Sequence, residues 1–204
     1  MVELTRRSPL SHRSPLLTPD CTCCIGERPF LGKLVLRCDP ADAAALEPVL
    51  GTALPHASPQ TTATDELTVL WLGPDEWMIV TAPNAEADLA ARIEEALAGK
   101  PHQVVAVSDY YTVIEIGGSH AREALAKLTA LDMHERAFKE GEVRGTVFAK
   151  AQAVIHMRSG TPKPAFDLYI RWSMADYLWC LLADAGHEFG MRTEQPIGGE
   201  RLVI

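Results

Sequence analysis

A β-rich run followed by a helical run occurs at corresponding places in the two halves of this sequence, and this repeat constrains the fold most. The first copy is EWMIVTAPNAEADLAARIEEALAG (residues 76–99), and the second is FDLYIRWSMADYLWCLLADAG (residues 166–186). In each copy apolar residues recur at helical spacing after the β-rich run, and a glycine ends the helix. The pattern indicates an internal structural duplication.

The first copy belongs to a longer order of elements. Asp39 and Pro40 are typical of a helix start, and the helix over 41–47 should end before Pro48, which has no amide hydrogen to donate. The order is strand, helix, strand, strand, helix, strand, as in the split βαβ arrangement of ferredoxin-like folds. Because the second half repeats it, we predict an α+β fold of two packed ferredoxin-like split-βαβ modules. The other strand-like runs of the first half are 32–38, 66–73 and 102–109.

The pattern divides the chain into four predicted segments. Residues 1–29 contain four prolines and little apolar periodicity, so we predict an extended N-terminal arm outside the core. Such an arm gains order by lying along a partner, with Arg7 and Arg13 reaching carboxylates there. Removal of residues 1–18 is then expected to spare the fold and weaken assembly. The other segments are a first module (30–109), a second module (110–190) and a C-terminal tail (191–204).

Charge and hydropathy exclude several classes of function. Nineteen basic residues against 27 acidic ones give a net charge of −8, which disfavours nucleic acid because binding to phosphates needs clustered cations. The one basic cluster (Arg6, Arg7 and Arg13) is too small for that role. No apolar run is long enough for a membrane span, and the first 20 residues lack the apolar region of a signal peptide. We therefore expect a cytoplasmic protein whose cysteines are mostly free thiols.

Three of the five cysteines lie in the tract CTCC, Cys21 to Cys24. A structural zinc site needs four ligands; His12 or His56 could supply the fourth, but nothing in the spacing requires it. Cys21 and Cys24 have the spacing of a redox pair, yet no helix is predicted to follow them. We predict thiols that hold no metal.

No catalytic, cofactor-binding or metal-binding residue is predicted. Dinucleotide fingerprints, phosphate-binding loops and nucleophile elbows are absent from the sequence. The GGS motif at 117–119 lies where amides can hold an anion, but a tight turn with its serine as helix cap is favoured. His156 is expected to be a satisfied structural histidine in a strand. Trp172, Tyr177 and Trp179 are expected to be core or interface anchors.

A family resemblance extends from about Arg7 to Gly186. It is carried by VSDYYTVIEIGGSHAREALAKLTALDMHERAFKEGEVRGTVFAKAQAVIHMRSG (107–160), by YIRWSMADYLW (169–179), by LGPDEWMIV (72–80) and by RRSPLSH (6–12). In their order and spacing these segments closely resemble the gamma subunit of heterotetrameric sarcosine oxidase. The CTCC tract is not part of the resemblance.

The resemblance implies a fold related to the folate-binding family of the glycine-cleavage T protein. It also implies a complex that oxidises the methyl group of sarcosine, giving glycine and hydrogen peroxide, and passes the one-carbon unit to tetrahydrofolate. The implied partners are alpha, beta and delta subunits, with FAD, FMN and NAD on alpha and beta and zinc on delta. This chain would then be a non-catalytic assembly component without a cofactor of its own.

An alternative hypothesis is an independent folate-binding protein or an aminomethyltransferase-like one-carbon enzyme. A buried acidic residue in a pocket, placed to hold a pterin, would favour it. Asp109, at the end of a strand-like run, is the best candidate because a carboxylate can pair with the donor edge of a pterin.

Overall fold

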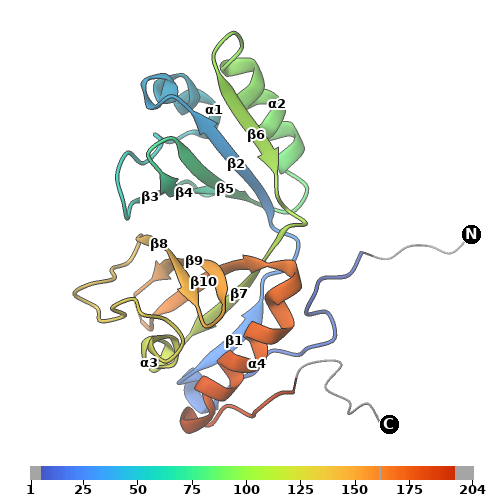
Figure 1. Cartoon of the computed structure of the whole chain (residues 1–204), viewed down its shortest axis with the longest axis vertical. Helices are drawn as coiled ribbons and strands as arrows, with labels where there is room; N and C mark the ends of the chain where they lie inside the picture. The colour runs from blue at the N-terminus through green and yellow to red at the C-terminus, as the bar shows by residue number, and fades with distance from the viewer. Residues whose placement is uncertain (1–5, 161, 196–204) are drawn as a thin grey trace, which may run out of the picture.

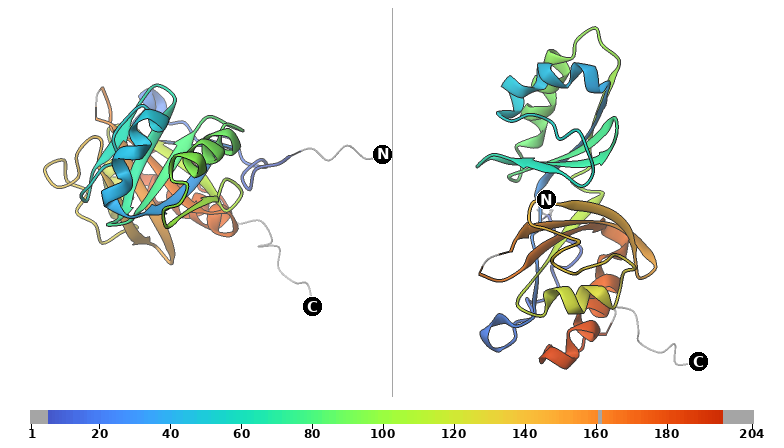
Figure 2. Two further views of the ribbon diagram at one scale, coloured as in Figure 1. Left: turned by 90° about the horizontal axis from the view of Figure 1, so that it is seen from above. Right: turned by 90° about the vertical axis from the view of Figure 1, so that its left-hand side faces the viewer.

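The structure is a computed structural model that describes residues 6–160 and 162–195, and it has four layers: helices, sheet, sheet, helices (Figures 1 and 2). The first sheet has the strand order β3-β4-β5-β2-β6, and the second has the order β1-β7-β10-β9-β8. All neighbouring strands in both sheets are antiparallel. The α+β prediction is confirmed, with five strands in each sheet.

Each sheet is built from one half of the chain, apart from β1. The elements of the first half are β2 (Gly32–Cys38), the 3-10 helix η2 (Pro40–Leu46), α1 (Glu47–Leu50), β3 (Thr61–Ala63), β4 (Leu67–Gly73), β5 (Glu76–Thr81), α2 (Glu86–Ala96) and β6 (His102–Ala106). Those of the second half are β7 (Tyr111–Gly117), α3 (Ala121–Ala126), β8 (Val143–Phe148), β9 (Ala151–Ser159), β10 (Ala165–Arg171), η3 (Trp172–Met174), α4 (Ala175–Ala185) and η4 (His187–Phe189). The N-terminal segment contributes η1 (Pro19–Cys21) and β1 (Cys24–Glu27).

Strand β5 shows why the strand-like runs are apolar at successive positions. Its side chains alternate between the two faces of the sheet. Trp77 and Ile79 pack in the core beneath α1 and α2, whereas Met78 and Val80 pack in the core between the two sheets. Both faces are buried, so the run has no polar alternation.

The two sheets repeat one arrangement, and β1 completes the second copy. In the first sheet β6, the last strand, pairs with the first strand β2 on the side away from β5. The equivalent place beside β7 is taken by β1, with Ile25 opposite Ile116. After α4 the chain forms η4 instead of a returning strand. A segment from the other end of the chain therefore fills the vacant edge of β7.

The prediction of an arm outside the core is therefore wrong for the described residues 6–29. Leu10, Leu16 and Ile25 are each at most 3% exposed and pack in the core of the second sheet. The sequence pattern concealed this because β1 is only four residues long and follows a proline-rich stretch. The predicted tail also begins in that core, with Met191 buried, while residues 1–5 and 196–204 lie outside the described residues. The module limits 30–109 and 110–190 stay a prediction.

The first helical segment runs further than predicted. The Asp39 carboxylate accepts a hydrogen bond from the Ala41 amide, which confirms the cap. The segment continues past Glu47 to Leu50, because Pro48 lies in the first turn of α1, where its missing amide hydrogen has no cost. Among the described residues, no helix combines the length and apolar character that crossing a bilayer requires.

The chain passes between the two sheets twice, from β1 to β2 and from β6 to β7. Both connections lie beside a buried lysine, Lys33 in β2. Its ammonium group donates to the Leu31 carbonyl, and its amide donates to the Ser108 hydroxyl, which in turn donates to Glu86. Burial lowers the pKa of Lys33 to about 8, although the Glu86 charge opposes the shift. The folded chain thus holds this proton less tightly than the unfolded chain does.

We expect this difference to appear in the pH dependence of stability. Between pH 8 and 9 the unfolded state binds more protons at Lys33, so the free energy of unfolding should rise with pH, by about 1 kcal/mol. Lys33→Met should remove the rise, and the exposed Lys150→Met should keep it. Urea unfolding at pH 8 and 9 measures both. Equal slopes for wild type and Lys33→Met would show that Lys33 titrates normally.

Candidate functional site

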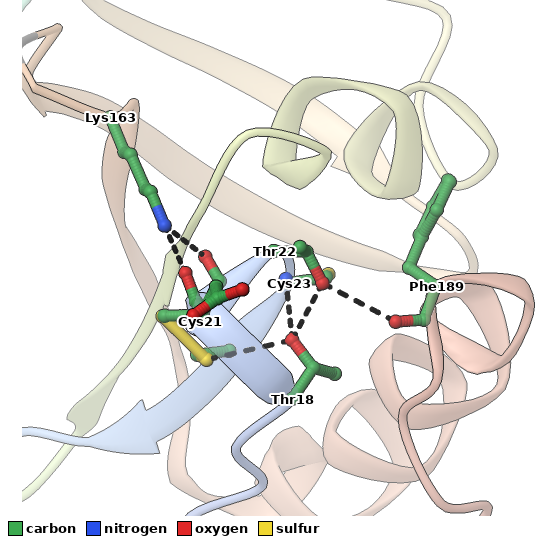
Figure 3. Close-up of a disulfide and its surroundings, with 8 residues drawn as sticks. Thr18, Cys21, Thr22, Cys23, Lys163 and Phe189 are labelled. Carbon is green, nitrogen blue, oxygen red and sulfur yellow. Dashed lines mark hydrogen bonds between the residues drawn. A yellow bond between two sulfur atoms is a disulfide. The ribbon is translucent and has the colours of Figure 1, made fainter.

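The CTCC tract forms a tight loop closed by a disulfide between Cys21 and Cys24 (Figure 3). Left-handed backbone at Asp20 and Cys21 turns the chain so sharply that the two Cα atoms are 5.5 Å apart, within reach of a disulfide. The prediction of free thiols is therefore wrong for this pair. The spacing of Cys21 and Cys24 indicated a cysteine pair, and the disulfide forms although no helix follows it directly. The free cysteines are Cys23, Cys38 and Cys180, all buried.

No metal set forms around the remaining thiol of the tract. Burial raises the pKa of the Cys23 thiol to about 11, so the thiolate that a metal needs is disfavoured. Across residues 6–160 and 162–195, no group of three or more His, Cys, Asp or Glu side chains is placed to hold a metal ion. Low zinc content remains a prediction for the purified protein.

The GGS motif packs against this disulfide loop. The amide of His120 donates to the Thr22 carbonyl at 2.8 Å, and the amide of Gly118 donates to the Pro164 carbonyl at 3.0 Å. These two amides donate to backbone carbonyls of other segments of the chain, so they are not available to bind an anion. The serine is not the helix cap, because α3 begins at Ala121 after His120 and has no side-chain cap.

An ion-pair cluster around a buried carboxylate lies in a cleft of about 360 Å³ between the sheets. Asp167, on β10, is 1% exposed and lies 2.5 Å from Arg28 and 3.4 Å from Arg158. Burial raises the pKa of Asp167, and the two guanidinium groups oppose that shift. No sequence-based prediction includes this carboxylate, although a charged residue inside the apolar run FDLYI indicates it.

His156 borders the same cleft from β9. It is buried in a strand, as predicted, but its Nδ1 has no hydrogen-bond partner in the described structure, so it is not fully satisfied. Burial, together with the nearby Arg158 and Arg28, lowers the pKa of His156 to about 4. The imidazole is therefore neutral near pH 7, beside a carboxylate already held by two arginines. The cluster has the composition of a structural ion-pair group.

Asp109, the sequence-based candidate for a pterin ligand, is not buried. Its side chain is 79% exposed and lies 2.7 Å from the guanidinium of Arg6. An exposed carboxylate already paired with an arginine is a poor anchor for a pterin.

Arg13, predicted to reach a partner, is held within the chain. Its guanidinium lies 2.7 Å from Asp176 at the start of α4 and 2.6 Å from Glu194. This network fastens the N-terminal segment to α4, while Arg7 is exposed.

The three predicted aromatic anchors occupy different environments. Trp179 is buried in the core of the second sheet, and Tyr177 is partly buried against that core. Trp172 lies at the surface beside Arg171 and lines a hollow there.

The comparisons agree with this architecture. The model of the "Sarcosine oxidase, gamma subunit family" matches residues 36–188. A sarcosine oxidase subunit gamma from Arthrobacter sp. is 34% identical over 156 residues, covering 74% of this chain and 76% of that protein.

Two solved structures share the fold. One is a heterotetrameric sarcosine oxidase from Corynebacterium sp. U-96, in complex with pyrrole 2-carboxylate, with a TM-score of 0.79 and 27% identity. The match covers 93% of this chain and 99% of that one. The other is aminomethyltransferase T of the glycine cleavage system from Bartonella henselae, with a TM-score of 0.58 and 17% identity over 78% of this chain and 44% of that one, a likeness of fold alone. The family model and the Arthrobacter relative show that this chain belongs to the sarcosine oxidase gamma subunit family.

Proposed function

We propose that this chain is the non-catalytic gamma subunit of a heterotetrameric sarcosine oxidase in the cytoplasm. Its partners are the alpha, beta and delta chains, which hold FAD, FMN, NAD, zinc and tetrahydrofolate. The complex converts sarcosine to glycine and hydrogen peroxide and passes the one-carbon unit to tetrahydrofolate. The role of the gamma chain is assembly and stability of the complex.

The structural match to the Corynebacterium protein carries this proposal. It extends over 93% of this chain and 99% of the chain it matches, at a TM-score of 0.79. A likeness that spans both sheets, and not a single motif, supports a shared role for the whole chain. The inter-sheet cleft is consistent with that role, because its buried carboxylate, Asp167, is already paired with Arg28 and Arg158.

The folate-binding alternative gains no support from its own discriminating residue. That hypothesis needed a buried carboxylate in a pocket, and Asp109 is exposed and paired with Arg6. Asp167 is buried and each of its oxygens faces an arginine: Oδ2 accepts a hydrogen bond from Arg28, and Oδ1, which has no hydrogen-bond partner in the described structure, lies 3.4 Å from Arg158. Its negative charge is therefore already matched by two cations.

Capture from native cells tests the proposal. We expect the tagged chain to bring down three further chains and a flavin absorbance spectrum, whereas the chain produced alone should be colourless. A chain that elutes without partners, or that alone transfers an aminomethyl carbon to tetrahydrofolate, would contradict it.

A further inference from the structure

An aromatic and arginine-rich surface lies where the chain crosses between the two sheets. It borders a hollow of about 680 Å³ lined by Arg6, Asp109, Tyr110, Arg171, Trp172 and Ser173. We call these six residues the crossover patch. They come from the N-terminal segment, from the connection between β6 and β7, and from the end of β10 with η3, so the fold alone brings them together.

The side chains of the patch hold one another in place. Arg171 lies over the ring of Tyr110, 5.5 Å from its centroid, and Tyr110 meets Tyr111 edge-on at 4.7 Å. The Trp172 amide donates to the Tyr110 carbonyl at 2.9 Å, which ties the end of β10 to the crossing. Aromatic rings and a planar guanidinium that are already held in place lose little conformational entropy on binding.

The patch is exposed to solvent, although exposing large aromatic side chains to water is unfavourable. Tyr110 is 45% exposed and is one of the few large apolar side chains so exposed in the described structure. Tyrosine, tryptophan and arginine are the residue types most enriched at the energetic centres of protein interfaces. The composition is therefore that of an interface.

The charge of the patch indicates what kind of surface covers it. Asp109 is already paired with Arg6, whereas Arg171 has no carboxylate partner within the described residues. The patch thus has one unpaired positive charge on a chain whose net charge is −8. A nucleic acid needs clustered cations, whereas a single guanidinium can pair one carboxylate, so the chemistry fits a protein segment that carries an acidic side chain.

We propose that the crossover patch is the docking surface for a partner chain of the oxidase complex, through a segment that presents a carboxylate to Arg171 and an apolar side chain to Tyr110 and Trp172. This inference rests on the proposed function and specifies the surface through which it is exerted. Docking at the crossing would bind the partner to both sheets at once and fix their relative position.

A charge reversal and an aromatic truncation at the patch test the inference in the intact complex. Tagged wild type, Arg171→Glu and Tyr110→Ala are each produced in the native host and used to capture the partner chains. Each variant should retain about tenfold less partner than wild type, and the wild-type complex should weaken as salt rises. Melting temperatures of the isolated chains should stay within about 2 °C of wild type, because both side chains are at the surface.

Arg136→Glu is the matched control, since Arg136 is also exposed and its side chain makes no ion pair in the described structure. It should capture as much partner as wild type. Equal capture by all variants would overturn the docking surface and leave the proposed function standing. Failure of wild type to capture any partner would overturn both. An isolated chain that dimerises, and becomes monomeric as Arg171→Glu, would identify a second copy as the occupant and also overturn the proposal.

Discussion

Deletion of residues 1–18 is expected to unfold the second sheet, contrary to what the composition of this segment suggests. The deletion removes Leu10 and Leu16, which are 2% and 3% exposed in the core beneath α3 and α4. Losing a buried leucine costs about 2–5 kcal/mol, and a domain of this kind is stable by about 5–15 kcal/mol in total. The deletion also removes Arg13 from Asp176 and Glu194, leaving two carboxylates without their cation.

Adjacent leucines provide a matched test. Leu16→Ala should lower the free energy of unfolding by about 3 kcal/mol, because Leu16 is buried and its backbone pairs with Ile25 of β1. Leu17→Ala should leave it unchanged within about 0.5 kcal/mol, since Leu17 is 75% exposed. Denaturant unfolding of both variants gives the comparison. If the two substitutions cost the same, or if the deleted chain melts like wild type, the segment is not part of the core.

Among the glycines that the structure describes, Gly118 is the one at which alanine is expected to disrupt the fold most. Gly118 has a φ of +121°, which side chains rarely adopt, and an added Cβ would overlap the backbone oxygens of Cys21 and Thr22. The disulfide loop cannot move aside easily, because the Thr22 carbonyl accepts a hydrogen bond from His120. Backbone strain and overpacking together should cost about 3 kcal/mol.

Gly99→Ala separates these two contributions. Gly99 also has positive φ, +80°, but a Cβ there would meet nothing within 4 Å. It should cost about 1 kcal/mol from strain alone, so Gly118→Ala should exceed it by about 2 kcal/mol in denaturant unfolding. Equal costs would mean that the loop yields to the added methyl group and is not closely packed on the turn.

The sheet and helix order could be predicted because it depends on local pattern. The run at 76–81 is apolar on both faces, and the run at 166–171 is apolar on the face that packs against α4. The helices after them have one apolar stripe, so each element is evident in its own residues. Strand β1 could not be predicted in this way. Its four residues are stabilised by β7, about ninety positions away, and pairing between such distant segments leaves no local period.

The functional features depended even more on distant contacts. The spacing of Cys21 and Cys24 was visible, but the left-handed turn that joins them was not. Asp167 interrupts an apolar strand and was detectable, whereas its partner Arg28 lies in a connection with no pattern. The crossover patch draws Arg6, Asp109 and Arg171 from three separate segments, so only the fold reveals it.

The capture experiment, made quantitative, tests the central claim most directly. The native mass of the complex captured on the tagged chain should correspond to one copy each of four different chains. The complex should contain bound flavin and release hydrogen peroxide when sarcosine is added. The same three partner chains produced without this one should assemble poorly or lose stability. A fully active and stable complex that forms without this chain would contradict its assignment as an assembly subunit.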